Sequence, residues 1–111
     1  MFEKKCGDGY RGVLPGIMQK TLVHGEKTLM VEFLLAKGAL LPMHSHPHEQ
    51  TGYLVSGRIR LTISGVPHEV QPGDSWCIAG GAEHRAEILE DSVAIEVFSP
   101  VREEYLPGGL S

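Results

Sequence analysis

Three histidines alternate in the segment HSHPHEQTG, which spans residues 44–52. In an extended strand, residues i and i+2 point to the same side, so His44 and His46 can present two imidazoles to one point. His48 follows beyond a proline that bends the chain, and Gln50 has the same parity as the first two histidines. Two imidazoles with one or two further ligands suit Zn, Ni, Mn, Fe(II) or Cu. The spacing therefore predicts a site for one divalent metal ion.

A third imidazole has to come from elsewhere in the chain, and His84 is the best candidate. It follows AGGAE, a glycine-rich turn that lets two backbone segments approach closely, and it begins an expected strand. His24 and His68 lie in polar, turn-like contexts and are expected at the surface. The alternative is that HSHPHE is a solvated loop and its histidines are incidental.

The elements that must position these residues are short strands. The chain has 14 glycines and 7 prolines, spread along it in a way that is typical of strands joined by tight turns. No stretch shows helical periodicity with caps, so we expect an all-β sandwich or barrel. Strands are expected within 13–23, 28–36, 37–42, 51–57, 58–65, 68–74, 75–81, 84–90 and 92–98. We expect the last two of these to pair with each other across Asp91.

Length and composition restrict the class of protein. A chain of 111 residues predicts a single domain, here with an N-terminal arm over 1–12 and a C-terminal tail over 106–111. The net charge is −4 without long blocks of like charge, which gives no indication of a nucleic-acid surface. No apolar signal segment or membrane-length apolar run is present, which predicts a cytoplasmic protein without a membrane partner.

The spacing around the histidine segment resembles the first motif of the cupin family. That motif is a glycine, five residues, His-x-His, three or four residues, an acidic residue, six residues and a glycine. The matching residues here are Gly38, His44, His46, Gln50 and Gly57. Glutamine stands where most cupins have glutamate.

The second cupin motif also has a counterpart. It is a glycine, five residues, Pro-x-Gly, two residues and a histidine, and the matching residues are Gly73, Ala79, Gly81 and His84. Alanine replaces the usual proline. The resemblance implies a small double-stranded β-helix, the cupin jelly-roll barrel, and a homodimer. It also implies one divalent metal in the barrel mouth, with four ligands: His44, His46, Gln50 and His84.

The glutamine changes the expected chemistry. A glutamate ligand would leave a charge of about +1 at the metal, whereas neutral Gln50 leaves about +2 and a stronger Lewis acid. The site is then a poorer match for the two-histidine, one-carboxylate iron site of oxygenases. Glu49 is the alternative ligand, although it breaks both the spacing and the strand parity. His48 could contact substrate or donate to a carboxylate beside the metal ligands.

A narrower resemblance joins HSHPHEQ with EVFSPVREEYL, residues 96–106. Both are similar to one branch of cupins, the pectin-degradation KdgF proteins, which open unsaturated monouronates to linear keto forms. The branch carries an acidic residue, more often aspartate, then a phenylalanine and an arginine, and the matching positions are Glu96, Phe98 and Arg102. The resemblance implies that these three residues belong to the site. In the enzyme hypothesis Glu96 moves protons, as a carboxylate near a metal in an apolar barrel can. The planar guanidinium of Arg102, with Arg60 as a second candidate, holds a substrate carboxylate.

Strand alternation in VAIEVF places Ala94, Glu96 and Phe98 on one face, away from the valines and the isoleucine. Three plainer interpretations stay open for these residues. Glu96 could face solvent or pair with an arginine of RIR (58–60), Arg102 could only tie down the tail, and Phe98 could be plain core.

We favour a metal-dependent isomerase or lyase-type enzyme for a small carboxylated sugar, using Lewis-acid and acid/base catalysis. The alternatives are a metal-dependent dioxygenase or another isomerase on the same barrel, and a non-catalytic small-ligand-binding or sensor protein.

Overall fold

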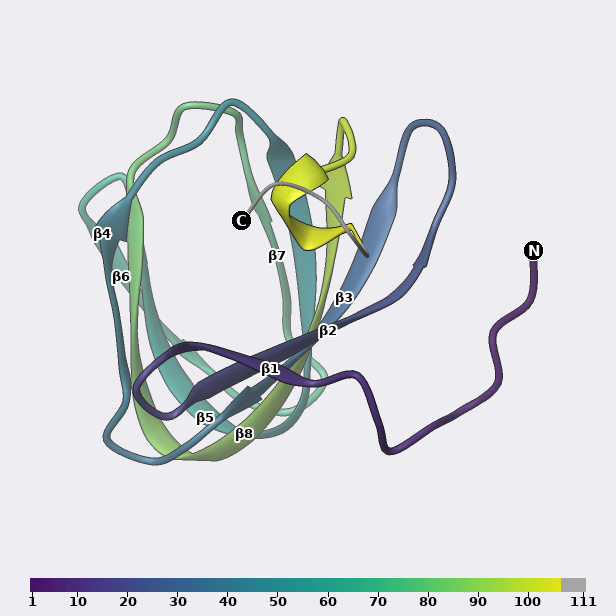
Figure 1. Ribbon diagram of the computed structural model, residues 1–111. Coiled ribbons are helices and arrows are strands. Elements are labelled where there is room, and N and C mark those ends of the chain that lie inside the picture. The colour runs from purple at the N-terminus through teal and green to yellow at the C-terminus, as the bar shows by residue number, and fades with distance from the viewer. Residues whose placement is uncertain (107–111) are drawn as a thin grey trace.

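The computed structural model describes residues 1–106, and nearly all of its regular structure is β-strand. The elements are β1 (Arg11–Leu14), β2 (Ile17–His24), β3 (Leu29–Leu35), β4 (Leu40–His44), β5 (Glu49–Ile63), β6 (Val66–Val70), β7 (Ser75–Ile78), β8 (His84–Ser99) and the 3-10 turn η1 (Glu103–Tyr105). The strands curl around a common centre, with η1 beside them (Figure 1). The all-β barrel prediction is confirmed. Of the predicted tail over 106–111, only its first residue lies within the described part.

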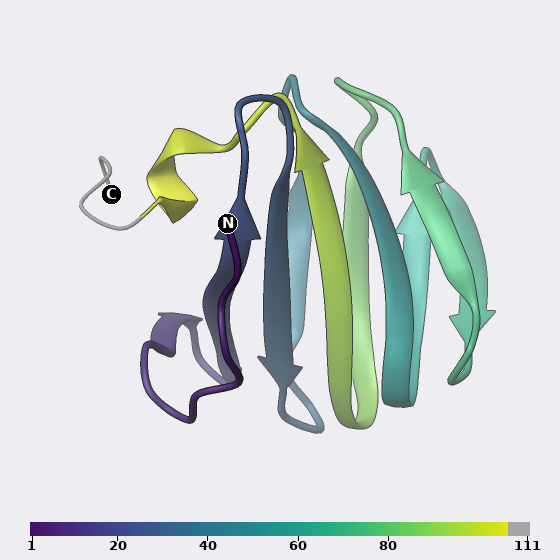
Figure 2. The same ribbon diagram turned by 90° about the vertical axis from the view of Figure 1, so that its right-hand side faces the viewer.

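The sheet is organised around the two longest strands, β5 and β8. Its order is β1-β2-β3-β8-β5-β6, with β4 added on β8 and β7 on β5. β8 pairs with β5 along its whole length, while its first half also pairs with β4 and its second half with β3. Figure 2 shows β8 running down the barrel, turning and returning, so that both of its ends lie at the same end of the molecule. This fold-back brings residues from both ends of β8 to one rim.

Two expectations about strands were wrong. The segments 51–57 and 58–65 belong to one strand, and so do 84–90 and 92–98. The halves of β8 each pair with β5 and not with each other, within residues 1–106. Gly57 and Asp91, which we interpreted as strand ends, lie at a bend in a continuous two-stranded ribbon. The β5–β8 register shifts there, between Leu54 and Ile59.

The barrel interior is filled by alternate residues of the strands. The buried apolar residues are Ile17, Leu29, Val31, Leu54, Ile59, Leu61, Val70, Ile78, Ala86, Ile88, Ala94 and Phe98. On the second half of β8, Ala94 and Phe98 are buried, which confirms the predicted alternation. Within the described residues, no helix has the length and apolar character needed to cross a membrane.

The bend of the β5–β8 ribbon depends on Gly57. Its φ is +92°, in the left-handed region, and a Cβ on it would lie 2.1 Å from Ser92 Oγ and 2.4 Å from the carbonyl oxygen of Asp91. Ser92 Oγ also donates to Glu90 O (2.7 Å) and accepts from Arg58 N–H (3.1 Å). Ser92 therefore fixes both strands at the point where only glycine fits.

Gly57→Ala is expected to destabilise the fold by about 3 kcal/mol, since it adds backbone strain and a steric clash. Gly65→Ala is the matched control, because Gly65 has a similar φ of +80° with nothing within 4 Å of its Cβ position. That control should cost about 1 kcal/mol. Urea unfolding measures both, and equal losses for the two variants would contradict the role assigned to the Ser92 contact.

Candidate metal centre and adjoining cavity

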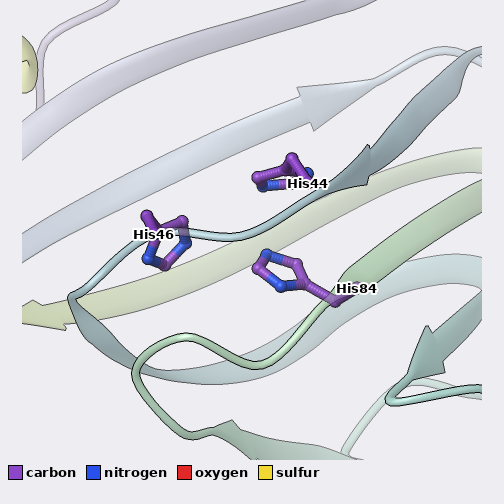
Figure 3. A group of neighbouring side chains, drawn as sticks. All are labelled: His44, His46 and His84. Atoms are coloured by element: carbon purple, nitrogen blue, oxygen red, sulfur yellow. The ribbon is translucent and has the colours of Figure 1, made fainter.

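Three of the predicted metal ligands come together at the rim. His44 ends β4, His46 lies in the loop that follows, and His84 begins β8 directly opposite His44 in the β4–β8 register. One possible ligand atom from each lies within 4.8 Å of the others, and the rings of His44 and His84 are 4.1 Å apart. Figure 3 shows the three rings gathered around one space. The predicted clustering of these histidines is confirmed.

Each of these rings is oriented by a backbone carbonyl. The Nδ1 atoms of His44, His46 and His84 lie 2.9–3.0 Å from the carbonyl oxygens of Pro42, His48 and Ala82. A carbonyl only accepts, so each Nδ1 carries a proton, and in the neutral form of each ring Nε2 keeps a lone pair. The Nε2 of His84 is buried and has no hydrogen-bond partner. A divalent metal would satisfy that orphaned atom.

The glycine-rich turn before His84 holds the two histidine-bearing loops together. Gly81 N–H donates to the carbonyl oxygen of His46 (2.8 Å). A Cβ on Gly80 would lie 2.4 Å from the carbonyl oxygen of Pro47, so a side chain there would push the loops apart. The close backbone approach expected from AGGAE is thus present, and it sets the separation of His46 from His84.

Gln50 lies at the start of β5 and is buried, whereas the neighbouring Glu49 is exposed. Its Oε1 is 2.7 Å from His46 Nε2, and its Nε2 donates to Glu96 Oε1 (2.6 Å). With a neutral His46 ring whose proton is on Nδ1, the first contact places two lone pairs face to face, since the amide hydrogens point towards Glu96. A cation between them would remove the conflict, and ligand atoms about 2.1 Å from one metal at right angles are about 3 Å apart. The donor set therefore fits a divalent metal.

Burial lowers the pKa of two histidines at the rim. Desolvation is the main cause for both His46 and His84, and the charge of Arg102 lowers the pKa of His46 further. Both pKa values therefore lie below 6.5, the ordinary value for histidine. The fold favours the neutral imidazole, which is the form that binds metal.

The metal-free protein should accordingly lose stability from these two histidines as the pH falls below 6.5. The unfolded chain takes up protons there before the folded chain does, whereas above that pH both states hold neutral rings. NMR titration of the histidine ring protons measures this, with His84→Ala assigning one set. Ring protons of His46 or His84 that titrate at 6.5 or higher would contradict it.

Two of the three histidines, His44 and His84, line a cavity of about 300 Å³. Most of its lining is apolar, from residues such as Ile59, Leu61 and Ile88. The polar residues of the lining are His44, Gln50, Trp76, His84, Glu96, Arg102 and Tyr105. A mostly apolar pocket with a few convergent polar groups is typical of a small-molecule site.

Glu96 points into this cavity from β8. Its Oε1 accepts from Gln50 Nε2 (2.6 Å) and from Trp76 Nε1 (2.9 Å). Burial of the carboxyl group raises its pKa, and the two N–H donors oppose that rise. The open interpretation that Glu96 faces solvent or pairs with Arg58 or Arg60 was wrong.

The two arginines of RIR lie elsewhere, on the outside of the barrel. Arg58 lies 4.0 Å from Glu90, and Arg60 pairs with Glu69 (2.9 Å) and Glu87 (3.2 Å). Arg60 is not among the residues lining the cavity. The suggestion that Arg60 helps to hold a substrate carboxylate is therefore wrong, because strand parity turns it outward.

Arg102 lines the cavity and also ties the C-terminal segment to it. Its Nε and Nη2 both lie 2.8 Å from Glu104 Oε1, and the guanidinium stacks over the rings of Tyr105 (4.2 Å) and Phe98 (5.0 Å). Its Nη1 makes no hydrogen bond within residues 1–106 and is not buried by protein atoms. Phe98 is 1% exposed, so it belongs to the core as well as to the cavity wall.

Sequence reasoning missed Trp76 and Tyr105, which both line the cavity. Trp76 is the chain's single tryptophan and lies in the strand SWCI, while Tyr105 follows Arg102 by three residues. A lone indole in a short apolar strand was a usable signal for the first. The position of Tyr105 depends on how η1 docks: Arg11 Nη2 donates to Glu104 O (2.5 Å), and Thr21 Oγ1 donates to Tyr105 O.

The barrel, its folded ribbon and the histidine cluster define a class of small β-barrel proteins with a candidate metal site at the rim. The family profile of the cupin domain matches residues 31–99. The chain belongs to the cupin family.

A more particular likeness is to KdgF. The solved structure of KdgF from Halomonas sp. is 31% identical, with a TM-score of 0.90, and the match covers 96% of this chain and 98% of that one. An RmlC-like cupin from Shewanella frigidimarina is 26% identical over 90% of each chain, with a TM-score of 0.86. A predicted oxalate decarboxylase from Thermotoga maritima shares 15% identity and, with a TM-score of 0.79 over 91% of this chain and all of that one, the fold alone. No curated protein matches the sequence.

Proposed function

We propose that this cupin is a metal-dependent enzyme that converts unsaturated monouronates to linear keto acids. The observation that carries the proposal is a neutral donor set at the rim of a cavity that also presents one carboxylate, Glu96, and one guanidinium, Arg102. The likeness to KdgF supports it. The proposal includes a homodimer in the cytoplasm as further predictions.

In this proposal the metal ligands are the Nε2 atoms of His44, His46 and His84 and the Oε1 of Gln50. The bound metal would supply a Lewis acid for the oxygen that gains negative charge during the reaction. Because Gln50 also donates to Glu96, the carboxylate lies one side chain away from the metal instead of binding it. The amide thus leaves the site's positive charge undiminished and keeps Glu96 available for proton transfer.

The proposed reaction is an isomerisation. The substrate is a cyclic hemiacetal with a double bond beside its ring oxygen, and it opens when the bond between the anomeric carbon and that oxygen breaks. The anomeric hydroxyl loses its proton and becomes the aldehyde, while the ring oxygen becomes an enol. The enol then gains a proton on carbon and loses one from oxygen, which gives the ketone. Glu96 carries these protons between oxygen and carbon, with no net gain or loss.

Incubation of the metal-loaded protein with the products of a pectate or alginate lyase tests the proposal. We expect the ultraviolet absorbance of the ring double bond to disappear faster than it does without protein, and the keto product to appear by NMR. A rate equal to the protein-free rate would refute the proposal for that substrate. Oxygen consumption with Fe(II) instead would indicate a dioxygenase.

Arg102→Ala is expected to raise KM about 10- to 100-fold, because a hydrogen bond to a charged group contributes about 1.5–3 kcal/mol. The free Nη1 is the atom assigned to the substrate carboxylate. Arg102→Lys should recover part of the loss, since it keeps the charge without the planar fork. Arg60→Ala, on the outer face, is the control and should leave KM unchanged. Initial rates across substrate concentration measure all three, and an unchanged KM for Arg102→Ala would count against this role.

A further inference from the structure

Trp76, Gly52 and Glu96 lie side by side across three strands. Gly52 of β5 is the register partner of Trp76 on β7 and also of Glu96 on β8. The indole therefore has to cross the backbone of β5 to reach Glu96, and its Nε1 donates to Glu96 Oε1 at 2.9 Å.

The crossing is possible because the middle residue has no side chain. A Cβ on Gly52 would lie 2.1 Å from Cε2 and 2.3 Å from Nε1 of Trp76. Both distances are far shorter than the non-bonded contacts that Cβ atoms make in proteins. The indole ring is rigid, so it cannot bend away at one end. Gly52 has no positive φ, so the space above it, and not its backbone conformation, is what requires glycine.

The contact decides which oxygen of Glu96 is free. Oε1 takes both N–H donors, from Gln50 at 2.6 Å and from Trp76 at 2.9 Å. Oε2 has no hydrogen bond in the described part of the chain and is not enclosed, although Glu96 lines the cavity. Two donors on one oxygen fix the rotation of the carboxyl group, whereas Gln50 alone would leave it free to turn.

We propose that Trp76, admitted by Gly52, is a positioning residue that holds Glu96 by Oε1 and presents Oε2 to the cavity. The inference rests on the proposed function for its catalytic meaning, because Oε2 would be the oxygen that carries protons. The arrangement itself is tested without any substrate.

The single tryptophan gives one indole N–H resonance in a ¹⁵N-labelled protein. In the metal-loaded wild type we expect it downfield, as for an N–H bound to a carboxylate. Glu96→Gln and Gly52→Ala should each move it. Glu69→Gln, on the outer face, and Gly25→Ala, with nothing within 4 Å of its Cβ position, should leave it in place. An indole N–H chemical shift that is the same in Glu96→Gln as in the wild type overturns the inference, whether or not the protein is active.

The kinetic arm uses Trp76→Phe, which keeps an aromatic ring and removes the N–H. We expect kcat to fall about tenfold or more, the loss of one hydrogen bond to a charged group, with KM within about threefold and the metal content unchanged. Gly52→Ala should show the same split, and if it does not fold, Trp76→Phe decides alone. A kcat within about twofold of the wild type overturns the positioning role. If the wild type is inactive on every uronate, the proposed function fails, and the indole resonance decides whether Trp76 holds Glu96.

Discussion

His84→Ala is expected to abolish both metal binding and activity. His84 is 2% exposed, its Nδ1 is tied to Ala82 O, and its orphaned Nε2 faces the other two histidines. Alanine removes one of the three neutral donors of the cluster. We expect bound metal to fall from about one ion per chain to a small fraction of that. Activity should fall at least about a thousandfold, because the metal contributes several kcal/mol of transition-state stabilisation.

Metal content by mass spectrometry and initial rates measure this prediction, and unfolding curves of the metal-free proteins show whether the barrel is intact. His68→Ala is the control, since His68 is exposed on β6 and does not belong to the cluster. His84→Ala that keeps its full metal content would refute the assignment of His84 as a ligand. Loss of metal with full activity would instead refute a catalytic role for the metal.

Glu96→Gln should separate the chemistry from the metal. The amide has the same shape and still offers an oxygen to Trp76, but it cannot take up a proton. We expect metal binding to persist and kcat to fall by about 10²- to 10⁴-fold, the usual contribution of a general acid or base. The contacts of Glu96 support a role in proton transfer. Among the described residues, it is the carboxylate that accepts from both Gln50 and Trp76.

The control for this variant is Glu87→Gln, in which the altered carboxylate belongs to the outer-face pair with Arg60. It should leave kcat unchanged. Glu96→Gln with kcat within tenfold of the wild type would show that another group moves the protons. Metal loss in Glu96→Gln would show that the Gln50 amide depends on Glu96 for its orientation, and the catalytic interpretation would then have to be withdrawn.

The histidine cluster and the strand class could be predicted from sequence because both follow from local geometry. Alternation along an extended chain brings His44 and His46 to one side. It also turns Glu96 and Phe98 of β8 towards the interior of the barrel. A glycine-rich turn before His84 indicated a close backbone approach, and Gly80 and Gly81 provide it.

The folded ribbon could not be predicted in the same way. Gly57 and Asp91 are turn-forming residues, and a local interpretation ends a strand at each. The β5–β8 pairing carries both strands through the bend, so tertiary hydrogen bonding overrides the local signal. The contact of Trp76 with Glu96 depends on the register of three strands, which no single segment encodes. The outward position of Arg60 does follow from parity, because its neighbours Ile59 and Leu61 take the inner face.

The pairing of β5 with β8 runs from Glu49 with Ser99 to Ile63 with His84, so it joins parts of the chain that are distant in sequence. Such contacts form slowly, because the loop between them must close before any pairing is gained. Gln50 and His84 meet only when this ribbon has closed, so the full donor set does not exist in a half-folded chain. An ion that binds only the finished barrel stabilises it by mass action. Bound metal should therefore prolong the lifetime of the folded protein by slowing its unfolding, while leaving the rate of folding unchanged.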